Sequence, residues 1–113
     1  MVDLTFLKNF TKGDASKMQR YISMYLNFAP ETFERMHQNI QDKAWTELAV
    51  NAHSLKPQAD YMGIITLKEI LIDIEEKVKN DQTEGMESLL LKAKVIHDAS
   101  EVLLQEFLDK ENQ

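Results

Sequence analysis

The residues best suited to chemistry in this chain are a histidine and a lysine three positions apart, His53 and Lys56. Residues with this spacing are neighbours on the surface of a helix. An exposed imidazole is largely neutral near pH 7, so one ring nitrogen can act as a nucleophile. A nearby ammonium favours the neutral ring and then attracts an anionic group once that group has been bound. The pair therefore suits the transfer of an anionic group such as phosphoryl.

A helix must carry His53 on its solvent side. At about 100° per residue, His53 points roughly 120° away from the mean direction of the apolar positions around it. Those positions are Trp45, Leu48, Ala52, Leu55, Ala59 and Met62. The exposed side of the same helix carries Thr46, Val50, Pro57 and Asp60, with Ala49 at its edge. We therefore expect a shallow surface with one nucleophile in its middle.

The residues around this histidine resemble the signature of histidine-containing phosphotransfer (HPt) domains. That signature reads His-x-Leu-Lys-Gly, with a second glycine ten residues after the histidine. His53, Leu55, Lys56 and Gly63 match it in place, and Pro57 stands where the pattern has glycine. The segments 3–7, 13–14 and 42–45 also resemble the family, so the resemblance extends over nearly the whole chain.

The resemblance implies a phosphocarrier of a multistep phosphorelay and not an autonomous kinase. His53 would accept a phosphoryl group from the aspartate of one receiver domain and pass it to the aspartate of another. Lys56 would stabilise charge on the phosphoryl oxygens. In the family, the receiver and its Mg²⁺ perform most of the catalysis, so no cofactor is expected on this chain. The implied partners are receiver domains of response regulators or of hybrid histidine kinases. The competing hypothesis is a non-catalytic helical interaction module with the same fold.

The resemblance also assigns a surface to the receiver. We call the set of Thr46, Ala49, Val50, Pro57 and Asp60 the docking face. Pro57 has two interpretations, a kink in the helix or a short side chain that gives a partner clearance. Lys56 can also be a flanking residue whose stem covers the edge of the core, and this is compatible with its charge role.

The next helix should supply groups at the level of His53. A very short turn at Gly63 folds two helices back on each other, so residues equally far from the turn lie side by side. This places Glu75 or Glu76, together with Lys79, near the histidine, where one carboxylate can fix the tautomer of the ring. A solvated run of charges is the alternative interpretation of these three residues.

The pattern of apolar residues predicts an all-α fold, an antiparallel four-helix bundle with a short N-terminal cap helix. The expected helices are 14–40, 43–62, 64–80 and 84–109, and residues 3–10 form the cap. Asp14 and Asp42 are candidate N-caps, and Pro30 predicts a kink or break near residues 27–29. The 113 residues fit a single domain, residues 1–113, and no segment alternates with the period of a strand.

Composition excludes several classes of function. The absence of cysteine rules out disulfides and thiol catalysis, and a net charge of −6 argues against nucleic acid and anionic membranes as partners. No apolar run is long enough to span a membrane and no signal pattern is present, so we expect a cytoplasmic location.

Glu34 and His37 have the Glu-x-x-His spacing of di-iron bundles, but only once, so no metal site is expected. His37 and His97 are interpreted as helix-flank residues, and the lack of a second obvious apolar face favours a monomer.

Overall fold

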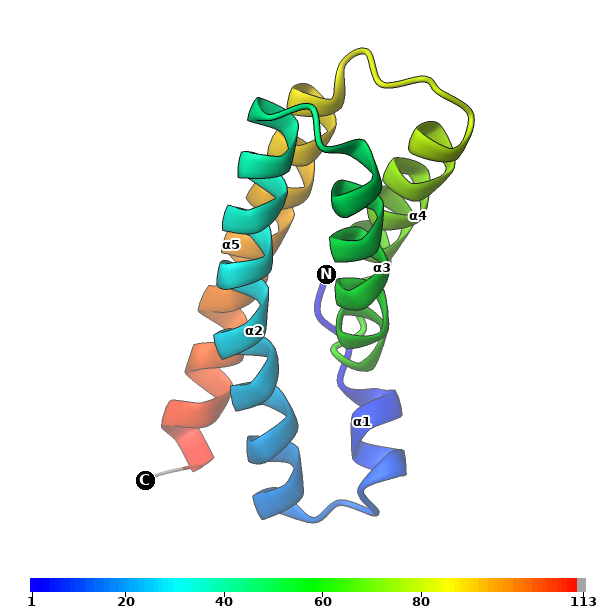
Figure 1. Ribbon diagram of the computed structural model, residues 1–113. Helices are drawn as coiled ribbons and strands as arrows, with labels where there is room; N and C mark the ends of the chain where they lie inside the picture. Colours follow the sequence, from blue (N-terminus) through cyan, green and yellow to red (C-terminus); the bar gives the residue numbers. More distant parts are fainter. Residues whose placement is uncertain (112–113) are drawn as a thin grey trace.

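A computed structural model describes residues 1–111, and within this range the chain forms five helices and no strand (Figure 1). The helices are α1 (Thr5–Phe10), α2 (Ala15–Gln41), α3 (Trp45–Tyr61), α4 (Ile65–Lys79) and α5 (Met86–Glu111). The expected all-helical class is therefore confirmed. Each predicted boundary lies within two residues of the observed one, and this includes the N-terminal cap helix, predicted over 3–10 and observed as Thr5–Phe10. No helix in the described range is both long and apolar enough to cross a membrane.

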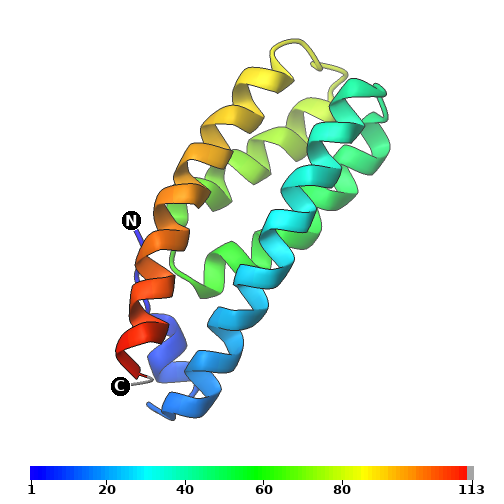
Figure 2. The same ribbon diagram turned by 90° about the vertical axis from the view of Figure 1, so that its left-hand side faces the viewer.

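The four longer helices lie side by side along the long axis of a molecule that measures 46 × 21 × 19 Å (Figure 1). Helix α2 packs against α3 and α5, and α4 packs against the same two helices. As a result, α3 and α5 stand at diagonal corners. Figure 2 shows α5 and α2 in front, with α3 and α4 behind them. The helix that carries His53 thus has its outer surface on the far side of the molecule from α5.

The core follows the apolar spacing of each helix. Side chains at intervals of three and four residues are buried on every long helix, because such positions recur on one face. On α3 these are Leu48, Ala52, Leu55 and Ala59, all predicted, whereas Trp45 is only partly buried. The other fully buried large side chains include Leu7, Ile22, Tyr25, Met36, Ile64, Leu67, Leu71, Ile74 and Met86.

Two predicted helix signals behave differently from expectation. Asp14 caps α2 by accepting a hydrogen bond from the Lys17 backbone N–H at 3.1 Å, as predicted. Asp42 does not cap α3; it ends α2, and α3 begins three residues later. Pro30 does not break α2, which continues from Ala15 to Gln41, because packing of its apolar face outweighs the loss of one backbone hydrogen bond.

Gly63 joins the N-terminal segment to the end of α3. Its φ of +67° is in the left-handed region, and a Cβ built there would lie 1.9 Å from the Asp3 carbonyl oxygen. The Asp3 N–H donates to the Met62 carbonyl oxygen at 3.2 Å. Glycine is therefore required here both for backbone conformation and for space. This close approach fixes α1 beside the C-terminal end of the helix that carries His53.

His97 is not the helix-flank residue that the sequence suggested, because it is only 1% exposed. Its Nδ1 accepts a hydrogen bond from the Tyr25 hydroxyl at 2.8 Å, and its Nε2 lies 3.2 Å from a carboxylate oxygen of Glu101. Burial lowers the pKa of His97, and burial together with the nearby acidic groups raises the pKa of Tyr25. His97 lies four positions after Ala93 and three before Ser100, both buried, so it falls on the buried face of α5, and hydrogen bonds allow a polar ring to be buried there.

Candidate functional site

His53 projects from the outer surface of α3, where 69% of its side chain is exposed. Its neighbours along the helix at positions 52 and 55 are fully buried, so the apolar stripe holds α3 with the histidine facing solvent. This is the orientation that the helical pattern predicts. A nucleophile in this position is accessible to a group carried by another protein.

Glu75 on α4 holds one nitrogen of this ring. Its Oε2 lies 3.1 Å from Nδ1 of His53, a contact between residues 22 positions apart in the chain. An ionised carboxylate only accepts hydrogen bonds, so Nδ1 carries the ring proton and the Nδ1–H group donates a hydrogen bond to Glu75. The neutral ring then has its free electron pair on Nε2. Of the two glutamates that the sequence offered, the structure therefore selects Glu75.

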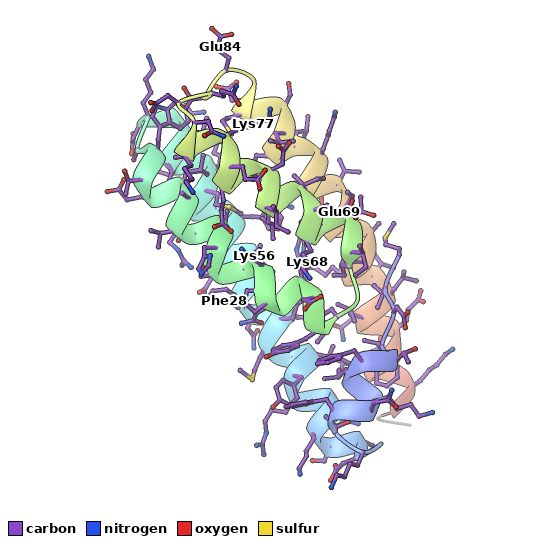
Figure 3. All side chains as sticks on the ribbon, turned by 90° about the vertical axis from the view of Figure 1, so that its right-hand side faces the viewer. Phe28, Lys56, Lys68, Glu69, Lys77 and Glu84 are labelled. Carbon is purple, nitrogen blue, oxygen red and sulfur yellow. The ribbon has the colours of Figure 1, made fainter. Side chains whose placement is uncertain are left out.

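The same carboxylate holds Lys56. The Lys56 Nζ lies 2.9 Å from Oε1 of Glu75, and both side chains are about three quarters buried. Oε1 has no well-aligned hydrogen bond among the described residues, so the ammonium stabilises it as a neighbouring charge. Figure 3 shows Lys56 on the face formed by α3 and α4. His53, Glu75 and Lys56 therefore form one cluster, with the carboxylate in the middle.

The other two predicted neighbours lie beside this cluster. Glu76 and Lys79 line a shallow pocket of about 230 Å³ together with Lys56, Ile72 and Glu75. Their side chains are exposed, and the hydrogen bond to the ring comes from Glu75. For Glu76 and Lys79, the interpretation as solvated charges is the one that the geometry favours.

The docking face is only partly an exposed surface. Thr46, Val50 and Pro57 are exposed, and 62% of the apolar Val50 is accessible to solvent. Ala49 is half-buried. Asp60 is turned toward α4, where it accepts a hydrogen bond from the Lys68 Nζ at 3.1 Å. Within the docking face, Asp60 is therefore the residue whose side chain is already paired with a lysine of the same chain.

The sequence did not reveal an apolar extension of the docking face at the C-terminal end of α3. Tyr61 stacks on Phe6 and Phe10 of α1, with ring centroids 5.6 and 6.2 Å away, and Tyr21 of α2 completes this aromatic cluster. A pocket of about 190 Å³ connects the cluster to the site; it is lined by Tyr21, Met24, Ser54, Pro57, Gln58, Tyr61 and Met62. Tyr61 could have been found from its position eight residues after His53. The placement of α1 could not, because no periodicity links it to α3.

No group of three or more potential ligand side chains is placed to hold a metal ion in residues 1–111. Comparison with protein families matched residues 20–110 to the family described as Hpt domain. The comparison with curated proteins found no match, and the comparison with solved structures found none. The matched range includes α3, α4 and the whole His53, Glu75 and Lys56 cluster.

Proposed function

Because the chain belongs to the Hpt domain family, whose members take part in phosphorelay phosphotransfer, we propose that His53 is its phosphoryl acceptor. The donor is an aspartyl phosphate of a receiver domain, and a second receiver aspartate takes the group afterwards. The observation that carries this proposal is the hydrogen bond from His53 Nδ1 to Glu75, because it leaves Nε2 free on an exposed ring. The partners are receiver domains of response regulators or of hybrid histidine kinases.

The transfer step follows from the tautomer. Nε2 of His53 attacks the phosphorus atom, an N–P bond forms, and the bond between phosphorus and the aspartate oxygen breaks. The electron pair of the broken bond stays on the receiver carboxylate. Nδ1 keeps its proton, so the phosphorylated ring carries a positive charge next to Glu75. The carboxylate thus stabilises the ring charge that develops during the reaction.

Lys56 has two tasks in this account. Before transfer, it compensates the charge of the Glu75 carboxylate, 2.9 Å away. After transfer, Glu75 is shared with the cationic ring, and the Lys56 ammonium can turn toward the phosphoryl oxygens. A partly solvated charge-assisted contact of this kind is worth about 1–2 kcal/mol. Lys56 therefore affects the rate of phosphoryl transfer and forms no covalent bond in the step.

The receiver binds over the docking face and its extension. Val50 and Pro57 flank the histidine on α3, one turn to either side, and offer a shallow apolar rim. Toward the C-terminal end of α3, the aromatic cluster supplies larger side chains of the type that anchor interfaces. Its members are Phe6, Phe10, Tyr21 and Tyr61. Pro57 is short and uncharged, so it fits the interpretation as clearance for a partner.

We further propose that α2 to α5 form an antiparallel four-helix bundle with α1 as its cap, and that residues 1–113 are one domain. The proposal is supported by the packing of α2 and α4 each against α3 and α5. In such a bundle α3 and α4 lie side by side, as the contact between His53 and Glu75 requires.

The direct test is to incubate the protein with a phosphorylated receiver domain and locate the label by peptide mapping. The account requires an acid-labile, alkali-stable phosphoramidate on the peptide that contains His53. If receivers bind the protein and no label ever reaches it, the chain is a non-catalytic interaction module.

A further inference from the structure

The pocket that joins the aromatic cluster to the site has the size of one side chain. Pockets for small-molecule ligands measure about 300–1,000 Å³. This one is smaller, about 190 Å³, and it lies between α2 and α3. Tyr21 and Met24 of α2 line one wall, and Pro57 and Tyr61 of α3 line the other. Because Pro57 is about one helical turn after His53, a protein bound over the histidine can place one side chain in this pocket.

Two basic residues of α2 stand at the edge of the pocket. Lys17 precedes Tyr21 by four residues, and Arg20 precedes Met24 by four. Residues with this spacing are neighbours on the surface of a helix. Both basic side chains are exposed, and neither makes an ion pair within residues 1–111. We call Lys17 and Arg20 the basic pair.

The acidic side chains closest to this edge in the chain already have partners. Asp14 accepts a hydrogen bond from the Lys17 backbone N–H at 3.1 Å, as the N-cap of α2. On α3, the Asp60 carboxylate is paired with the Lys68 ammonium at 3.1 Å. These contacts leave the charges of the basic pair available to a group on another protein.

Other carboxylates lie farther away or on another side of α2. The next acidic residue along α2 is Glu31, eleven positions after Arg20 and therefore about 16 Å along the helix. Glu106 of α5 lines a hollow on the α5 side of α2, and Figure 1 shows α5 and α1 on opposite sides of that helix. Two more exposed lysines, Lys8 and Lys12, belong to α1 and the turn after it. The pocket edge is therefore basic in a chain whose net charge is −6.

Resting on the proposed phosphotransfer function, we propose that the receivers of this protein carry an apolar side chain flanked by carboxylates near their phosphorylated aspartate. The apolar side chain enters the pocket, and the carboxylates meet the basic pair. Opposite charges of this kind steer two proteins together and raise the rate of association. A receiver with lysine or arginine at the same place is repelled, so the basic pair selects among receivers. The basic pair takes no part in the chemical step at His53.

A surface with aromatic and basic side chains also suits an anionic membrane. Two observations favour the receiver. The pocket is concave and adjoins the histidine, so it fits a side chain that projects from a protein. The net charge of −6 opposes approach to an anionic lipid surface.

The test measures the association rate with a receiver domain that phosphorylates the wild type. Lys17→Glu/Arg20→Glu should lower this rate at least about tenfold at low salt. The matched control is Lys92→Glu/Lys110→Glu, which gives the same net charge through two exposed lysines of α5 and should associate much faster. Between about 0.01 M and about 1 M salt, the screening length falls from about 30 to about 3 Å. The wild-type rate should fall over this range, and the rate of Lys17→Glu/Arg20→Glu should not.

Transfer within the complex separates recognition from chemistry. At a saturating concentration of the receiver, Lys17→Glu/Arg20→Glu should transfer phosphoryl as fast as the wild type does. Equal association rates of the two double variants would overturn this inference and leave the proposed function intact. A wild type that no receiver phosphorylates would reject the proposed function and the inference together. Binding to phosphatidylserine vesicles that only Lys17→Glu/Arg20→Glu loses, with unchanged receiver association, would assign the basic pair to a membrane and overturn the inference.

Discussion

Oε2 of Glu75 and Nδ1 of His53 lie 3.1 Å apart, on two helices that a short turn folds back on each other. This contact decides which ring nitrogen is free. Glu75→Ala should shift the neutral ring from the Nδ1–H form toward a mixture of tautomers and slow phosphotransfer about tenfold, equivalent to about 1.4 kcal/mol.

Nitrogen NMR of the imidazole reports the tautomer, and transfer kinetics report the rate. Glu76→Ala is the matched control, because Glu76 is an adjacent exposed glutamate that leaves the Glu75 contact in place. If Glu75→Ala had the same tautomer and rate as Glu76→Ala, Glu75 would have no positioning role.

Lys56→Ala should slow transfer by roughly one order of magnitude without stopping it, because a partly solvated charge contact contributes about 1–2 kcal/mol. Single-turnover transfer from a phosphorylated receiver measures this directly. Lys79→Ala removes a lysine from the neighbouring pocket and should have little effect. A complete loss of transfer in Lys56→Ala would show that the lysine is essential to the chemical step.

Val50→Glu should weaken binding of a receiver at least about tenfold, since it places a carboxylate beside the site where an acidic phosphoryl donor must approach. Val95→Glu, the same change on the diagonal helix, should leave receiver binding unchanged. Titration calorimetry with one receiver compares the two variants, and circular dichroism checks that both remain helical. Equal binding by both variants would mean that the receiver uses another face.

Gly63→Ala should lower the free energy of unfolding by about 2–3 kcal/mol. The left-handed conformation costs a Cβ-bearing residue about 1–2 kcal/mol, and the added carbon must also displace the Asp3 backbone. Gly85→Ala is the control, because its φ is +75° but no atom lies within 4 Å of an added Cβ. Urea denaturation of both variants separates conformational strain from the steric clash. Equal losses would show that the contact with Asp3 contributes nothing.

Stability should fall as the pH is lowered from about 7 to about 5. Burial depresses the pKa of His97 in the folded state, so the unfolded chain binds more protons below the ordinary histidine pKa of about 6.5. The stabilisation from the neutral ring is fully present above that pH and is lost as the pH falls toward the folded-state pKa. The slope approaches about 1.4 kcal/mol per pH unit for one proton.

Denaturation curves across this range test the effect, with His97→Gln and His37→Gln as the pair to compare. His97→Gln should lose the slope, whereas His37→Gln should keep it, because His37 is exposed on α2. A slope that persists in His97→Gln would have to come from other groups.

Much of the site could be predicted from the sequence because one helix carries most of it. The apolar stripe of α3 fixes the exposure of His53, and the short turn at Gly63 fixes the level at which α4 passes it. Periodicity alone could not choose between Glu75 and Glu76, since the choice depends on how α4 is rotated against α3. It also could not show that Glu75 holds Lys56 as well as the histidine.

Features that depend on contacts between distant segments were less predictable. The burial of His97 depends on a hydrogen bond from Tyr25, 72 positions away. The aromatic cluster depends on the docking of α1 against Tyr61, which the approach of Asp3 to Gly63 controls. Both contacts join residues far apart in the sequence, so the apolar pattern of a single helix could not predict them.

The most direct test of the central claim is transfer of radiolabel from a phosphorylated receiver to three proteins: wild type, His53→Gln and His37→Gln. Both substitutions replace an exposed histidine and should cost little stability. Wild type and His37→Gln should take up the label equally, and His53→Gln should take up none. Full labelling of His53→Gln would contradict the assignment of His53 as the phosphoryl acceptor.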